Sequence, residues 1–166
     1  MIEFTYNDGG RSAAGFKGST GDCVTRAIVI VTGKPYMEVY NTLNELSDSY
    51  NQRLRPRKTK SGIRMRRRSG ARTGVSKDIY HKYLLSLGMK WTPTMFIGQG
   101  CKVHLRAEEL PAGKLIVCVS KHLTAVIDGI VNDTFNPARE VHETGYKDGE
   151  FYSKINGRCV YGYYSF

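Results

Sequence analysis

The stretch Gly18–Thr32 reads G-S-T-G-D-C-V-T-R-A-I-V-I-V-T, and the fold is best predicted outward from it. Its apolar residues recur with the period of an α-helix, at Val24, Ala27, Ile28 and Val31. Gly33, followed by Lys34-Pro35, ends this pattern. We therefore expect a buried helix that begins at Cys23 or next to it.

A cysteine at the first turn of a helix has the local features of a nucleophile. Asp22 is of a type favoured at the N-cap, and Gly18 and Gly21 let backbone amides approach a group in front of the helix. The positive end of the helix dipole favours the thiolate of Cys23, which is the form that attacks carbonyl carbons. The alternative interpretation is a packed core cysteine, the more frequent role of a cysteine on an apolar helix.

The length and composition predict one domain that spans residues 1–166. No run of 18 apolar residues is present, and the first ten residues lack the layout of a signal peptide. We therefore expect no contact with a membrane and a cytoplasmic location. The cysteines form no C-x-x-C pair and no metal-binding spacing with histidine, so we expect all of them to be reduced and expect no metal or cofactor. They are Cys23, Cys101, Cys118 and Cys159.

The net charge of +10 is concentrated in one segment, which contains ten cations and no acidic residue between positions 53 and 72. Its low periodic apolar content and its glycines and proline predict a mobile loop at about 51–72. Its charge density predicts binding to nucleic acid or to an acidic host protein. The alternative is a solvated stretch without a specific partner. The cations are Arg53, Arg55, Arg57, Lys58, Lys60, Arg64, Arg66, Arg67, Arg68 and Arg72.

The rest of the chain predicts an α+β fold, with helices first and an antiparallel sheet afterwards. Two further helices are expected, from Pro35 to about Tyr50 and from Ser76 to Leu87, and a polar loop is expected over Asn136–Arg158. A short helical turn is expected near Ala107–Leu110. Alternating apolar patterns predict strands at Ile2–Tyr6, Met89–Phe96, Lys114–Ser120, His122–Ile127, Ile130–Phe135 and Cys159–Phe166.

The dipeptide Asp128-Gly129 between two apolar runs predicts a β-hairpin with a two-residue turn. In that register the numbers of facing residues add to 257, which places His122 opposite Phe135 and makes Asp133 its diagonal neighbour on one face. Asp133 is then the carboxylate that orients His122. A slip of one residue would favour Asn132 or Asn136 instead, and a histidine bonded only to backbone is the alternative for His122.

G-D-C-V-T-R-A-I at residues 21–28 and K-H-L-T-A-V-I-D-G-I-V-N-D-T at residues 121–134 resemble segments of the papain-like cysteine peptidase superfamily. The first is similar to the cysteine box of ovarian-tumour-type deubiquitinases, and the second resembles the histidine strand of bacteriocin-processing peptidases. The general layout also resembles that of uncharacterised phage and prophage proteins. This resemblance implies a viral origin and action in the host cell cytoplasm.

The resemblance implies a papain-like fold in which the cysteine helix and further helices pack on a C-terminal antiparallel sheet. It also implies hydrolysis of an amide or isopeptide bond in a protein or peptide substrate. Cys23 would be the nucleophile, His122 the general base and then acid, and Asp133 the orienting residue. No glutamine precedes the cysteine, so the candidates for holding the oxyanion are Ser19, Asp22, Asn7 and the backbone amide of Cys23. The rival hypothesis is a basic binding protein without chemistry.

Overall fold

The computed structural model describes residues 2–18, 20–139 and 141–166, without the side chains of 141–143 and 154–156. The described part is an α+β fold with three α-helices, one short 3₁₀ helix and a six-stranded mixed sheet. The helices are α1 (Cys23–Thr32), α2 (Tyr36–Gln52), α3 (Lys77–Ser86) and the 3₁₀ helix η1 (Ala107–Glu109). None of the helices in the described residues is long and apolar enough to cross a membrane.

Helix α1 forms where the sequence predicts it, because its apolar residues repeat at the spacing of helix turns. Val24, Ala27, Ile28 and Val31 are all buried. Gly33 ends the helix in the left-handed conformation, and its N–H donates to the carbonyl of Val29 at 2.8 Å. Cys23, which is half-buried, is the first residue of the helix and lies at its positive end.

The large sheet has the strand order β1-β7-β6-β5-β10-β4. Its strands are β1 (Glu3–Tyr6), β4 (Lys90–Pro93), β5 (Lys114–Val119), β6 (His122–Ile127), β7 (Ile130–Asp133) and β10 (Val160–Ser165). The C-terminal strands pair antiparallel as expected, but the sheet as a whole is mixed, since the N-terminal β1 pairs with β7 in parallel. A short turn would force an antiparallel pair, but the chain between β1 and β7 includes all three helices and leaves the direction of β1 free.

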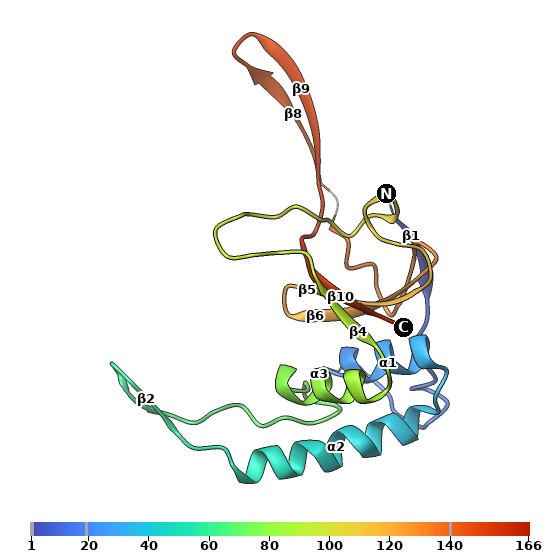
Figure 1. Ribbon diagram of the computed structural model, residues 1–166, viewed down its shortest axis with the longest axis vertical. Helices are drawn as coiled ribbons and strands as arrows, with labels where there is room; N and C mark the ends of the chain where they lie inside the picture. The colour runs from blue at the N-terminus through green and yellow to red at the C-terminus, as the bar shows by residue number, and fades with distance from the viewer. Residues whose placement is uncertain (1, 19, 140) are drawn as a thin grey trace.

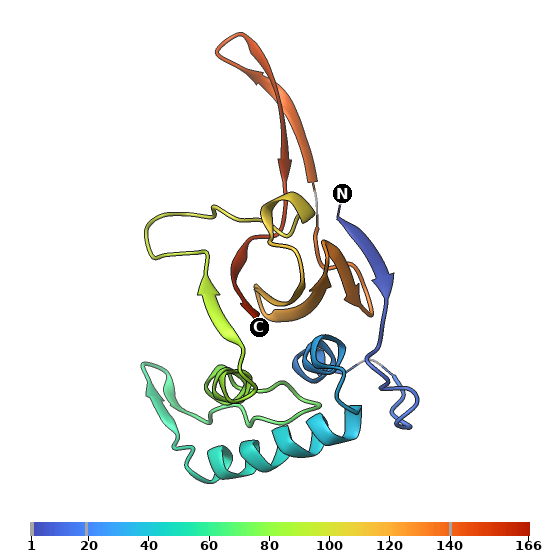
Figure 2. The ribbon, with the colours of Figure 1, turned by 45° about the vertical axis from the view of Figure 1, so that its right-hand side comes forward.

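The three helices lie on one side of the curved sheet, as Figures 1 and 2 show. Helices α1 and α3 lie next to the sheet, and α2 lies behind them on the outside. The sheet has a core on each face. One core joins the helices to residues such as Ile116 and Ala125, and the other lies between Val117, Val126 and the loops on the opposite face.

Two predicted loops contain β-hairpins, and in both cases the loop prediction is wrong over the paired residues. The basic segment includes β2 (Arg57–Thr59) and β3 (Gly62–Arg64), all of whose residues are exposed. The polar segment after β7 includes β8 (Val141–Lys147) and β9 (Glu150–Asn156), which project from the body on the side away from the helices (Figures 1 and 2). Both hairpins pair through the backbone, so neither requires a buried apolar face.

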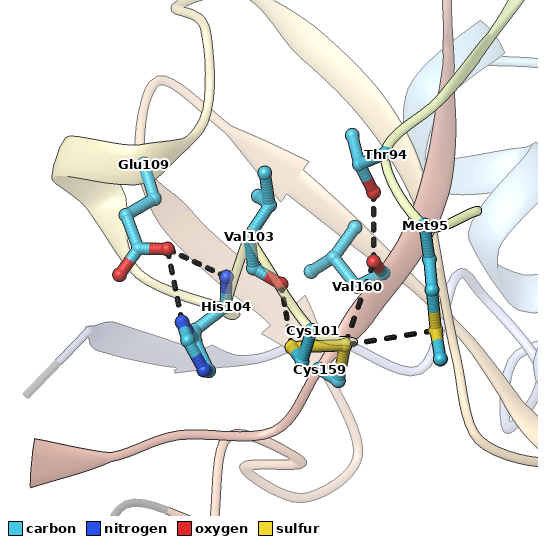
Figure 3. The surroundings of a disulfide bond; sticks show 8 residues. All are labelled: Thr94, Met95, Cys101, Val103, His104, Glu109, Cys159 and Val160. Carbon is cyan, nitrogen blue, oxygen red and sulfur yellow. Dashed lines mark hydrogen bonds and ion pairs between the residues drawn. A yellow bond between two sulfur atoms is a disulfide. The ribbon is translucent and has the colours of Figure 1, made fainter. Parts of the chain in front are cut away.

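The expectation that all four cysteines are reduced is also wrong. Cys101 and Cys159 form a disulfide with their Cα atoms 5.8 Å apart, whereas Cys23 and Cys118 are free. The bond ties the loop after β4 to the start of β10, as Figure 3 shows. Backbone bonds hold the same contact, since Val160 N–H donates to Val103 C=O at 2.8 Å. The two sulfurs meet because the topology brings together segments that are 58 residues apart.

The end of the basic segment is fixed against the helices. Ser69 is buried, and its backbone N–H and C=O bond to the side-chain amide of Asn51 on α2, each at 2.8 Å. Ala71 is buried as well, and its carbonyl accepts a hydrogen bond from Thr25 Oγ1 of α1 at 2.9 Å. The residues that follow the β2–β3 hairpin are therefore held at the N-terminal end of α1.

Candidate active site

The β6–β7 hairpin has the predicted register. Val126 faces Val131 and Ala125 faces Asn132, so the facing numbers add to 257. Asp128 and Gly129 both have positive φ values, of 48° and 78°, as the two central residues of a type I′ turn require. Because side chains alternate along a strand, this register places His122 and Asp133 on the same face.

His122 and Asp133 form a buried pair. Nε2 of His122 lies 2.7 Å from Oδ2 of Asp133, and because an ionised carboxylate can only accept, Nε2 carries the proton. The other oxygen of Asp133 accepts from Arg26 Nη2 at 3.0 Å and from the N–H of Thr134 at 2.7 Å. The ring of His122 also contacts Phe135, with centroids 5.0 Å apart. These contacts fix the orientation of the imidazole and leave Nδ1 as its second functional atom.

Cys23 meets this imidazole across the boundary between helix and sheet. Burial would raise the pKa of the Cys23 thiol, but the hydrogen bond and charge of His122, together with a backbone hydrogen bond of Leu123 and the charge of Arg26, lower it. Burial would lower the pKa of His122, but its bonds to Asp133 and Cys23 raise it to about 9. Burial would raise the pKa of Asp133, but His122 and Arg26 lower it. The three pKa shifts thus favour the charged forms, with the thiolate of Cys23 beside the imidazolium of His122 and the carboxylate of Asp133.

Two other histidines have different partners. His81 Nδ1 lies 2.8 Å from the hydroxyl of Tyr164, and His104 Nδ1 lies 3.1 Å from Glu109 (Figure 3). His142 has a side chain outside the described residues. Cys118 provides a contrast to Cys23, because burial raises the pKa of its thiol to about 12. Cys23 and His122 are thus the thiol and imidazole whose properties support nucleophilic chemistry.

The side chains expected to hold an oxyanion have other partners. Asp22 is fully buried and bonds to Arg26 and to the hydroxyl of Tyr36, the latter at 2.8 Å. Asn7 donates to Asn132 Oδ1 at 3.3 Å and accepts from the N–H of Gly9. Ser19 lies outside the described residues. Asp22 occupies the N-cap position without a side-chain capping bond.

This arrangement leaves the backbone N–H of Cys23 at the open end of α1. In the described part of the chain this N–H has no hydrogen-bond acceptor. The first N–H groups of a helix have no partner within the helix and carry its positive partial charge. The amide of Cys23 therefore points a donor toward the region in front of the helix.

Two hollows of about 730 and 460 Å³ meet at the cysteine, and the walls of both include Cys23, Lys121 and His122. The larger hollow extends past α3 and β4 and is lined in part by Tyr80 and Trp91. The smaller one extends toward β1 and the loop before α1, and its wall includes residues such as Arg11, Thr20 and Phe135. A chain bound across Cys23 would therefore have space on both sides of the sulfur.

The cleft contains residues that sequence reasoning did not single out. Trp91 and Lys77 line the larger hollow, where the ammonium of Lys77 lies 5.5 Å from the centre of the Trp91 ring. Lys121 lies in the turn between β5 and β6, directly before His122. Lys121 could have been predicted to lie near the site, because it directly precedes His122 in the sequence. Lys77 and Trp91 lie on elements far from Cys23 in the sequence, and no local pattern marks them.

The ten cations of the basic segment do not lie together. Arg67 and Arg68 line the larger hollow, and Arg72 bonds to the carbonyl of Lys17 and stacks over Phe16. Those on the β2–β3 hairpin lie beyond the C-terminal end of α2 (Figure 1). They are Arg57, Lys58 and Arg64 on the strands, and Lys60 in the turn.

Comparisons of the chain with protein-family models, with curated proteins and with solved structures found no match. Within the described residues, no group of three or more His, Cys, Asp or Glu side chains could hold a metal ion.

Proposed function

We propose that this protein is a papain-like cysteine hydrolase that cleaves an amide or isopeptide bond. The observation that carries the proposal is the line of three groups from Cys23 through His122 to Asp133, held by a 2.7 Å bond at its far end. A nucleophile, a base and an orienting carboxylate in that order are what acyl transfer through a thiol requires. The two hollows that meet at Cys23 give room for a chain on either side of the bond.

The first half of the reaction makes an acyl-enzyme. The Cys23 thiolate attacks the carbonyl carbon, a C–S bond forms, and the carbonyl electrons move onto oxygen. The backbone N–H of Cys23 and the positive end of α1 stabilise this oxyanion. When the C–N bond breaks, His122 Nδ1 gives its proton to the leaving amine.

The second half regenerates the thiol. Neutral His122 removes a proton from water, which attacks the thioester and releases the carboxylic acid as the C–S bond breaks. Asp133 keeps the proton on Nε2 throughout, so Nδ1 remains the atom that exchanges protons. Arg26 holds Asp133 from the other side and prevents its carboxylate from turning away.

The test is the relative reactivity of the two free thiols toward iodoacetamide at neutral pH, followed by mass spectrometry. Cys23 should label faster than Cys118 in the folded protein by about 100-fold, because Cys118 is buried and its pKa is raised. His122→Gln should slow the labelling of Cys23, whereas His81→Gln serves as the matched control. Equal labelling of Cys23 and Cys118, or hydrolysis of an identified substrate by Cys23→Ala, would refute the proposal.

A second candidate function is binding of a polyanion, such as host nucleic acid, without chemistry. It is favoured by the β2–β3 hairpin, whose four cations are exposed at one end of the molecule. A filter-binding titration over a range of salt concentrations should give a steep negative slope that disappears when those cations are neutralised. A flat response to salt would exclude this function for the hairpin.

A further inference from the structure

The wall of the active-site cleft is cationic. Arg67, Arg68, Lys77 and Lys121 line the larger hollow, and no Asp or Glu of the described residues lines either hollow. The carboxylates of Asp22 and Asp133 are buried and bonded to Arg26 and His122. The positive charge of the cleft is therefore not balanced within its own walls.

These cations are available to a ligand. None of the four forms an ion pair within the described part of the chain. All four are exposed. Arg67 also donates to the carbonyl of Thr73, in the loop that Ser69 and Ala71 anchor against α1 and α2. The loop that bears Arg67 and Arg68 is thus fixed beside the larger hollow.

We propose that the larger hollow binds an acidic segment of a polypeptide substrate next to the bond that Cys23 attacks. Substrate carboxylates would contact Arg68, Lys77 and Lys121, and an apolar substrate side chain would pack on Val75, which lines the same hollow. The field of several like charges in a cleft raises the local concentration of an oppositely charged ligand. This inference rests on the proposed function and adds the class of substrate.

A polypeptide fits the site better than a nucleic acid for two reasons. The thiolate and imidazole are suited to attack on an acyl carbon, which polypeptides supply at every residue and nucleic acids lack in their backbone. The ring of Trp91, which could stack on a base, is already in contact with Lys77 and with Tyr164, whose ring centroid lies 4.6 Å away. Less of that ring is open to a planar base.

The experiment compares two peptidyl chloromethyl ketones that alkylate Cys23 and differ only in having two glutamates or two glutamines. The glutamate probe should react about tenfold faster at low ionic strength, and the advantage should fall as salt is added. The double variant Arg68→Gln/Lys77→Gln should reduce the advantage to about twofold or less. Lys82→Gln/Lys114→Gln removes the same charge at exposed positions outside both hollows and should retain it.

Each outcome of the experiment decides one point. Equal rates for the two probes, with rapid labelling of Cys23 by uncharged iodoacetamide, would overturn the acidic substrate and leave the hydrolase proposal standing. Slow labelling by iodoacetamide as well would overturn both. Oligothymidylate that protects Cys23 from the glutamate probe better than polyglutamate of equal charge would overturn the inference in favour of a nucleic acid. Stronger protection by polyglutamate would support it.

Discussion

Replacement of Asp133 by asparagine should move the proton of neutral His122 from Nε2 to Nδ1. Oδ1 of Asp133 accepts from Arg26 Nη2, from the N–H of Thr134 and, at 3.5 Å, from the hydroxyl of Thr134, and the first two of these donors cannot accept hydrogen bonds. They will therefore face the oxygen of the new amide, and its NH₂ group will turn toward Nε2 of His122. Nε2 must then accept, so the proton moves to Nδ1, which is the nitrogen needed to take a proton from Cys23.

The size of the effect follows from the pKa of His122. That pKa is about 9 against an ordinary value of 6.5, and the difference corresponds to about 3 kcal/mol in favour of the imidazolium. Both Asp133 and Cys23 contribute to this stabilisation of the imidazolium. Without the carboxylate, the pKa of His122 should fall to between about 7 and 8, and the pKa of the Cys23 thiol should rise toward its ordinary value of 9.0.

The assay is the rate of iodoacetamide labelling of Cys23 as a function of pH. In the unmodified protein the labelling rate of Cys23 should change near pH 9, where the imidazolium of His122 loses its proton. In Asp133→Asn the labelling rate at pH 7 should fall by at least about tenfold, because less of the thiol is ionised. Hydrolysis should fall by about 100-fold or more, since His122 would present the wrong nitrogen.

Asp128→Asn is the matched control, because it makes the same chemical change on the same hairpin. Asp128 lies in the exposed turn, where its carboxylate accepts from the N–H of Gly113 at 2.9 Å. Asparagine also tolerates the positive φ of this position. The control should keep the pH profile of the parent. If Asp133→Asn keeps that profile too while remaining folded by circular dichroism, the role assigned to Asp133 is wrong.

Three further predictions concern stability. The stabilisation contributed by the His122 imidazolium is fully present below pH 6.5 and is lost as the pH rises through about 9. The Tm of the parent protein should therefore fall over that range by more than the Tm of His122→Gln, and an equal fall of Tm in both proteins would contradict this. Cys101→Ser/Cys159→Ser should lower the free energy of unfolding by about 2–4 kcal/mol in urea, and alkylation of all four cysteines in unreduced, unfolded protein would show that the bond is absent. Gly162→Ala should cost about 1–3 kcal/mol, because the added Cβ would overlap the Trp91 ring; an unchanged urea midpoint would refute that overlap.

The parts of the structure that the sequence predicts well depend on short-range patterns. Helix α1 follows from the spacing of its apolar residues, and the register of β6 with β7 follows from Asp128-Gly129 alone. That register was enough to predict that His122 and Asp133 lie side by side. Cys23 could be singled out from its position at the helix start. Its approach to His122 depends on how α1 packs against β6, which local patterns do not specify.

The hairpin β8–β9 shows that a clear local signal can be outweighed by composition. Asp148-Gly149 is the same dipeptide as Asp128-Gly129 and has the same two positive φ values, of 54° and 85°. Tyr146 and Phe151, on either side of it, pair across the hairpin with ring centroids 5.4 Å apart. The polar, glycine-containing composition of the segment predicts a loop, because most strands of a folded domain bury one face. A projecting hairpin has no such requirement.

The disulfide and the cationic wall could not be predicted from local patterns, because both depend on long-range topology. Cys101 and Cys159 meet only because the loop after β4 lies beside the start of β10. Arg68 and Lys77 meet the cleft because Ser69 is anchored to α2 between them in the sequence. The basic run was recognisable, but nothing in it indicated that one end borders the nucleophile and the other extends away from it.

Asp22 links these observations. The sequence placed it correctly at the N-cap, but its carboxylate turns inward to bond Arg26 and Tyr36 instead of capping the helix amides. Arg26, one helical turn later, then reaches Asp133 on the hairpin and fixes the helix to the strand that orients His122. The N–H of Cys23 is the first of the helix and has no acceptor in the described part of the chain, whichever way the Asp22 side chain turns. In the proposed mechanism, the bonds from Asp22 to Arg26 and from Arg26 to Asp133 align the base with the nucleophile, and the start of α1 supplies the donor that an oxyanion needs.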